Sequence, residues 1–137
     1  MFQIKRRKDG NRKWRFMCTI CFYQDSRHKN SLKWIQEILN AGYMSDRKDG
    51  ITELRINGFE TVQSILESLL PFIRFKKIQA KAMYNAVKIL SNKRFVDLDD
   101  YEILHLVDLM IEIQNRNYAT KSKKSKNELL KIVGLTP

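Results

Sequence analysis

Two runs of alternating apolar and polar residues constrain the fold of this 137-residue chain more than any other feature. The runs cover residues 1–5 and 15–23, and the segment Asp9-Gly10-Asn11 lies between them. A period of two is typical of a strand with one buried face, and Asp-Gly favours a tight turn between two strands. The sequence therefore predicts a β-hairpin.

Alternation also assigns each side chain of this hairpin to one of two faces. The predicted core face carries Phe2, Ile4, Phe16, Cys18, Ile20 and Phe22. The opposite face is basic and polar and carries Gln3, Lys5, Arg7, Arg15, Met17, Thr19, Cys21 and Tyr23.

The rest of the chain continues with helices and a second hairpin. Helical spacing and stop signals predict a helix over 31–40, strands over 43–47 and 51–57, helices over 59–70, 74–90 and 97–114, and a final apolar turn at 129–133. This ββαββααα order predicts an α+β fold. We expect one domain over 1–118, followed by a basic tail over 119–137.

The charge is strongly positive and is arranged in blocks. The formal net charge is +11, and residues 1–33 hold ten Lys and Arg against Asp9 and Asp25. Residues 97–115 hold six acids and no Lys or Arg, which predicts a solvated helix. Such blocks favour one cationic face and a polyanionic partner, with a generally basic surface as the alternative.

Several classes of protein are disfavoured. No apolar run is long enough for a membrane span, and no apolar segment follows the basic start, so we expect an intracellular protein without a membrane partner. Cys18 and Cys21 form a CxxC, but residues three apart on a strand point to opposite faces, so we expect no metal site there. Nucleotide-binding loops and hydrolase triads have no signal.

The basic strand face is the most informative functional feature. A two-stranded ribbon fits the DNA major groove, where alternate side chains reach base edges. Lys5, Arg7 and Arg15 suit guanine or phosphate, and Gln3 suits adenine. An RNA-binding sheet would show a similar face, usually with more aromatic residues.

Three segments carry a resemblance to a known family. They are Gly42-Tyr-Met-Ser-Asp-Arg47, Leu70-Pro-Phe-Ile-Arg-Phe-Lys-Lys-Ile-Gln-Ala80 and Val107-Asp108. With the hairpin–helix–hairpin–helix order, the chain resembles the single-motif LAGLIDADG homing endonucleases. The resemblance implies a saddle-like antiparallel sheet, a homodimer on a long double-stranded DNA site, and Mg²⁺-dependent phosphodiester hydrolysis. It also implies an intron or intein host, in a chloroplast, a mitochondrion or a prokaryotic cytoplasm.

The resemblance assigns roles to individual residues. Gln24 would position a water molecule, Lys76 would polarise the site, and the basic residue after Gln24 would be Arg27 or His28. The implied base-reading positions are Gln3, Lys5, Arg7, Arg15, Met17, Thr19, Cys21, Tyr23, Ser45, Arg47, Glu53 and Arg55. From their charge, we expect the tail residues Lys121, Lys123 and Lys124 to contact phosphates.

The sequence departs from the family in one respect. The family's name motif is a helix before the first strand, which ends in the metal-binding acid and forms the dimer interface, whereas Met1 lies inside that strand. We therefore expect residues 1–137 to lack the metal ligand, unless a separate segment supplies it. The alternatives are a catalytically decayed DNA-binding domain and a maturase-like RNA-binding protein. A basic ribosome-associated protein is disfavoured by the segment over 70–80.

Overall fold

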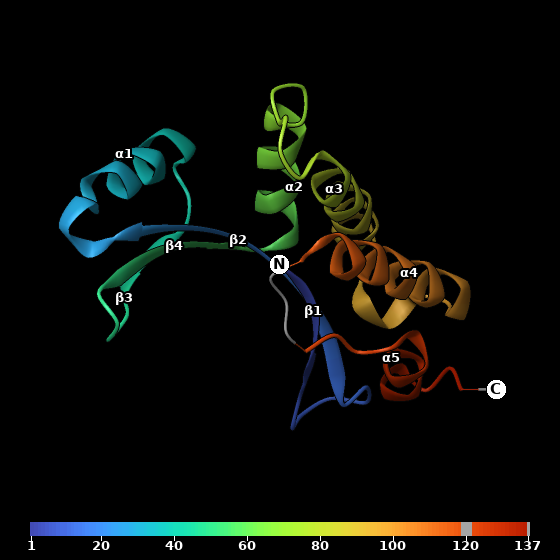
Figure 1. Cartoon of the computed structure of the whole chain (residues 1–137). Helices are drawn as coiled ribbons and strands as arrows, with labels where there is room; N and C mark the ends of the chain where they lie inside the picture. The colour runs from blue at the N-terminus through green and yellow to red at the C-terminus, as the bar shows by residue number, and fades with distance from the viewer. Residues whose placement is uncertain (119–121, 137) are drawn as a thin grey trace.

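A computed structural model describes residues 1–118 and 122–136 of the chain (Figure 1). In order, the strands and α-helices are β1 (Phe2–Arg6), β2 (Trp14–Asp25), α1 (Asn30–Leu39), β3 (Tyr43–Asp46), β4 (Ile51–Asn57), α2 (Phe59–Leu69), α3 (Lys77–Asn92), α4 (Asp100–Arg116) and α5 (Lys126–Val133). Two 3-10 turns, Ser26–His28 and Phe95–Asp97, connect some of these elements. The predicted α+β class is confirmed.

The four strands form one antiparallel sheet in the order β1-β2-β4-β3. The long strand β2 pairs with β1 over its first half, from Trp14 to Cys18, and with β4 over its second half, from Thr19 to Asp25. The sheet therefore arches, and the two hairpins form its two legs (Figure 1). All five helices lie on the outer side of this arch, which leaves the concave side uncovered.

The core lies between the sheet and the helices. Phe2, Phe16 and Cys18 from the first hairpin are buried there, as their alternation predicts. Trp14 packs edge-on against Phe95, with ring centroids 5.0 Å apart, and so ties the hairpin to the segment before α4.

Helix boundaries differ from the sequence prediction where a backbone feature intervenes. Helix α3 begins at Lys77 and not at residue 74, because Lys76 takes a left-handed conformation with φ of 57°. Helix α4 begins after Asp99, whose side chain accepts from the Glu102 N–H in a capping box.

The final apolar turn is a complete helix, α5, so four helices follow the second hairpin and not three. Its capping box is formed by Ser125 and Glu128, a signal that the apolar pattern at 129–133 did not include. Leu129 and Val133 are buried in the same core as the sheet. Part of the predicted basic tail is thus built into the domain.

The approach of β3 to β4 depends on Gly42. A Cβ atom at this position would lie 2.7 Å from both the Arg55 carbonyl oxygen and Ile56 Cγ1, and the φ of Gly42 is +90°. Glycine is the residue type that satisfies both demands at little cost.

Among the described residues, no helix is both long and apolar enough to cross a membrane.

Candidate nucleic-acid interface

The concave face of the sheet brings together side chains from both hairpins. Across the first hairpin, Gln3 lies opposite Met17 and Lys5 lies opposite Arg15. Across the second half of the sheet, Arg55 lies between Cys21 and Tyr43, and Glu53 lies between Tyr23 and Ser45. One continuous surface therefore carries nearly all the positions that alternation assigned to the polar face.

The cations of the first hairpin are open to solvent on this surface. Lys5 and Arg15 are exposed, and no carboxylate of the described residues lies within salt-bridge distance of either. Arg7 pairs with Asp9 at 2.9 Å, and this hydrogen bond lowers the pKa of the Asp9 carboxyl. Lys5 and Arg15 thus leave uncompensated positive charge on the concave side.

Glu53 is the centre of a different arrangement on the second hairpin. Its carboxylate accepts from Arg47 Nη1 at 3.1 Å and from Arg55 Nε at 2.5 Å. The hydrogen bond from Arg55 is the main reason that the pKa of Glu53 lies below its usual value. Glu53 itself is 3% exposed, and its carboxylate holds the partly exposed guanidinium groups of Arg47 and Arg55 in place. Its predicted contact with bases stays a prediction.

Thr19 also differs from its predicted role. It lies on the concave face, but it is buried and its hydroxyl donates to Asn57 Oδ1 at 2.7 Å. Its hydroxyl oxygen keeps acceptor capacity, but burial keeps it away from the surface. Thr19 therefore links β2 to β4 and does not contribute to the open surface.

Tyr43 is a surface residue that the sequence analysis missed. It is 52% exposed and lies directly opposite Arg55 on the concave side. The signal was present, because Tyr43 precedes the predicted contact residue Ser45 by two positions and therefore shares its face.

Lys76 lies at the base of the first hairpin. It lines a groove of about 530 Å³ together with Gln3, Cys21 and Tyr23 from the sheet and residues of α4 and α5. Gln114 also lines this groove, and its buried Oε1 accepts no hydrogen bond from the described residues. The groove thus joins the concave face to an unsatisfied polar atom of α4.

The other three predicted catalytic residues do not line this groove. Gln24 lies opposite Thr52, and its Oε1 accepts from the Asp25 N–H at 3.0 Å. Arg27 donates to both carboxylate oxygens of Asp25, which lowers the pKa of Asp25 to about 2. His28 is exposed in the turn that follows β2. Their catalytic roles stay predictions.

The three tail lysines predicted to contact phosphates lie in different surroundings. Lys121 lies outside the described residues, and Lys123 is exposed before α5. Lys124 lines the groove that contains Lys76 and also a second pocket on the outer side of the first hairpin.

The two cysteines take opposite faces of β2, as predicted. Cys18 is buried in the core, where burial raises the pKa of its thiol to about 12, and Cys21 lines the groove with Lys76. Both are free thiols.

Comparison with known proteins identifies the family. The chain is 33% identical over 92 residues to the DNA endonuclease I-CvuI of Chlorella vulgaris, a match that covers 67% of this chain and 57% of I-CvuI. Crystal structures of I-CvuI on DNA superpose with a TM-score of 0.82 at 26% identity; the one with its own target covers 99% of this chain and 86% of that chain. The chain belongs to the LAGLIDADG homing endonuclease family.

Other comparisons of this LAGLIDADG chain show which proteins share its fold and how much of a relative's length it matches. The LAGLIDADG meganuclease I-AabMI, solved on uncleaved DNA, matches 79% of this chain and 38% of that one with a TM-score of 0.63 at 20% identity, which shows a shared fold. No family model matches the chain. The matched region spans little more than half the length of the curated relative I-CvuI.

Proposed function

We propose that the concave face of this LAGLIDADG protein binds double-stranded DNA at a specific site. The observation that carries this proposal is the row of alternate side chains around Lys5 and Arg15 on a sheet face that no described helix covers. A two-stranded ribbon enters the wide major groove of B-form DNA, and arginine donates two hydrogen bonds to guanine. In support, I-CvuI has been crystallised in complex with its DNA target.

Duplex DNA is favoured over double-stranded RNA by the shape of this surface. The major groove of A-form RNA is deep and narrow, so a rigid two-stranded ribbon cannot reach its base edges. Among the residues assigned to the concave face, Tyr23 and Tyr43 are the exposed aromatic side chains, which is few for a surface that stacks single-stranded bases. A maturase-like RNA-binding protein is therefore the second candidate.

We further propose that the protein contributes to hydrolysis of the DNA backbone, the activity that names its relative I-CvuI. Lys76 is the best-placed candidate, because it lines the groove next to the concave face, where an ammonium group can stabilise negative charge on a phosphate. Gln24 would orient a water molecule, and Arg27 or His28 would contact the phosphate. In this proposal two copies of the chain act on the two halves of the site.

The described residues do not by themselves fit a Mg²⁺ ion. No three His, Cys, Asp or Glu side chains gather closely enough to hold a metal within residues 1–118 and 122–136. Hard divalent cations prefer carboxylate oxygens, which neither Gln24 nor Lys76 provides. The Mg²⁺ expected for the family would therefore require an acid from another segment. Residence in an organelle or a prokaryotic cytoplasm also stays a prediction.

Binding to matched duplexes tests the proposal. We expect selection of one duplex site from a randomised pool, and weaker binding to an RNA duplex of the same sequence at every salt concentration. Equal binding to DNA and RNA duplexes, or recovery of no common sequence, would contradict the proposed function. Tighter binding to a structured RNA would favour the maturase-like alternative.

A further inference from the structure

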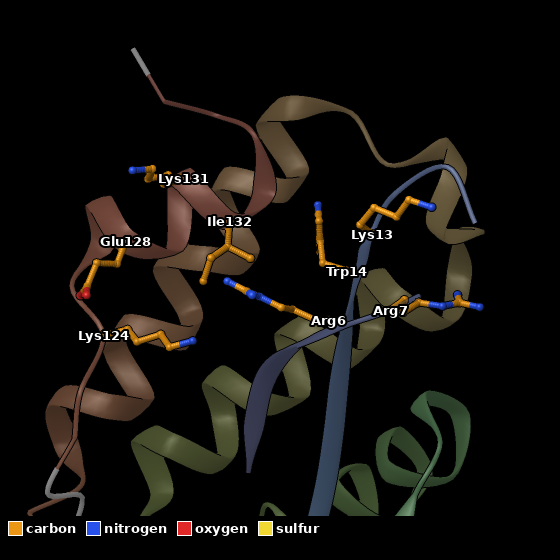
Figure 2. Close-up of a pocket in the computed structure, with 8 residues that line it drawn as sticks. All are labelled: Arg6, Arg7, Lys13, Trp14, Lys124, Glu128, Lys131 and Ile132. Atoms are coloured by element: carbon orange, nitrogen blue, oxygen red, sulfur yellow. The ribbon is translucent and has the colours of Figure 1, made fainter. Parts of the chain in front are cut away.

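A second basic site lies on the outer side of the sheet. It is a pocket of about 630 Å³ between the first hairpin and α5, lined by Arg6, Lys13, Trp14, Lys124, Lys131 and Ile132 among others (Figure 2). The pocket lies on the side of the sheet that the helices cover (Figure 1). Arg7 and Lys124, two residues with predicted DNA contacts, lie at its edge, whereas Arg6 and Trp14 have no such predicted role.

The alternation of β1 places Arg6 in this pocket. Arg6 lies directly opposite Trp14, and cross-strand partners share a face of the sheet. It therefore extends the row of Phe2 and Ile4 and not the row of Lys5 and Arg7. Figure 2 shows Arg6 pointing toward α5, whereas Arg7 points the other way.

The charge of the pocket is only partly balanced by the described residues, because Arg7, which also lines it, pairs with Asp9. No carboxylate of the described residues lies within salt-bridge distance of four other cations that line it, Arg6, Lys13, Lys124 and Lys131. Glu128, the acid that lines the pocket, accepts from the backbone N–H of Ser125 at 2.7 Å, which helps to keep the pKa of this carboxyl low. Glu128 therefore supplies one negative charge against these four cations.

A neighbouring lysine on α5, by contrast, has a carboxylate partner. Lys126, two residues from both Lys124 and Glu128, pairs with Asp108 at 2.5 Å.

Arg6 and Lys124 extend toward each other from β1 and from the segment before α5, whereas Lys13 and Lys131 point outward (Figure 2). A bound anion would reduce the repulsion between Arg6 and Lys124. The pocket is therefore arranged for an acceptor with several oxygen atoms.

The donors present suit one class of anion. Arg6 offers a planar fork of N–H groups, and the lysines offer mobile ammonium groups, a combination that fits the tetrahedral oxygens of phosphate. Trp14 adds an indole N–H, and no acceptor among the described residues forms a hydrogen bond with it. Ile132 and the Trp14 ring supply an apolar wall beside these donors.

We propose that this outer pocket binds a phosphate group, separately from the DNA-binding face. The group is either free phosphate or the terminal phosphate of a nucleic-acid strand. A bound phosphate would connect α5 to β1 and β2, whose other face presents Lys5 and Arg15. The site goes beyond the proposed function and does not require it.

The indole N–H signals of the two tryptophans provide the test. The chain has only Trp14 and Trp34, and Trp34 is 63% exposed on α1, away from the pocket, so it is an internal reference. The protein is labelled with ¹⁵N-tryptophan and titrated with inorganic phosphate, and then with a short single-stranded oligonucleotide with or without a 5′-phosphate. Sodium chloride of equal ionic strength is the control titration.

We expect saturable shifts of the Trp14 signal with phosphate and little change of the Trp34 signal. Arg6→Gln or Lys124→Gln should weaken this binding by roughly tenfold or more, since each removes a charged donor. Lys88→Gln removes the same charge from the exposed side of α3 and should leave the binding unchanged.

The oligonucleotide arms identify the source of the phosphate. Tighter binding of the 5′-phosphorylated strand than of free phosphate assigns the pocket to strand ends, and equal or weaker binding assigns it to the free anion. Equal shifts of Trp14 and Trp34, shifts reproduced by chloride, or shifts that survive both substitutions would overturn the proposal. Arg6→Gln should also keep full affinity for the duplex target, which separates this site from the concave face.

Discussion

Arg55 donates from its Nε to Glu53 Oε2 at 2.5 Å, two residues away on the same strand and on the same face of the sheet. The carboxylate is covered by the side chains that it binds, so it organises the surface without being part of it. Arg47, from the turn end of the hairpin, completes the arrangement. Guanidinium groups held in one orientation lose less freedom when they contact DNA.

Glu53→Gln should make the stability of the fold less sensitive to acid. The pKa of Glu53 is lowered in the folded state, so its carboxylate stabilises the protein above the unfolded pKa and loses this effect as pH falls through the folded pKa. The wild type should therefore lose more unfolding free energy than Glu53→Gln between pH 6 and pH 3. Denaturant titrations at each pH measure this difference, and parallel profiles for the two proteins would contradict it.

Gly42→Ala should destabilise the second hairpin much more than Gly50→Ala. Both glycines have positive φ, but a Cβ atom at Gly50 meets nothing within 4 Å, whereas at Gly42 it meets β4 at 2.7 Å. The strain of a positive φ costs about 1 kcal/mol in each variant, and overpacking adds a further ~1–3 kcal/mol at Gly42. Thermal or denaturant unfolding of the two variants measures the difference, and equal losses would show that β3 moves away at no cost.

The residues that the sequence predicted well are those governed by local periodicity. Alternation correctly placed Phe16 and Cys18 inside and Lys5 and Arg15 outside, because one face of each strand packs on helices. It could not show that Thr19 and Glu53 are buried on the polar face. Thr19 binds Asn57, which the strand register brings opposite it, and Glu53 binds Arg47, which the second hairpin brings alongside it.

The catalytic residues were assigned by resemblance and not by periodicity. Lys76 was predicted inside a helix, yet its left-handed backbone places it before α3 and in the groove with Tyr23. No role is predicted for Arg6 from the sequence, because alternation assigns binding only to the cations on the polar face. An arginine that continues the apolar row of a strand is itself a signal, because the row ends there in an exposed cation beside α5.

Arg15→Ala should relax sequence preference, whereas Lys123→Ala should weaken binding to all sequences alike. Arg15 is exposed on the concave face, and none of the described carboxylates pairs with it, so it is free to contact a base edge. Its loss should cost roughly 1–3 kcal/mol of discrimination. Arg47→Ala should have a similar effect, because its loss also releases Glu53. Selection from a randomised pool measures the preference, and a loss at Lys123 equal to that at Arg15 would contradict these assignments.

Duplex affinity should fall steeply with salt. Several lysines and arginines on one face displace the counterions of as many phosphates, so the slope of log affinity against log salt should be on the order of −4 or steeper. Arg15→Ala should make the slope less negative if this residue also contacts phosphate, and Arg6→Gln should leave it unchanged. Fluorescence anisotropy over a range of salt concentrations gives the slope, and a flat dependence would exclude the nucleic-acid assignment.

The last prediction concerns cleavage. Residues 1–137 should bind the duplex target yet cut it negligibly with Mg²⁺, because the described residues place no carboxylate cluster near Lys76. An added helix that ends in Asp, fused or in trans, should restore cleavage, because it supplies the oxygen ligand that Mg²⁺ prefers.

Lys76→Ala should then reduce the cleavage rate by roughly 10²-fold, as loss of a charge that stabilises a transition state does. Lys77→Ala, at the next position and on α3, is the matched control and should retain the rate. Efficient double-strand cleavage without the added helix would show that another carboxylate supports the reaction.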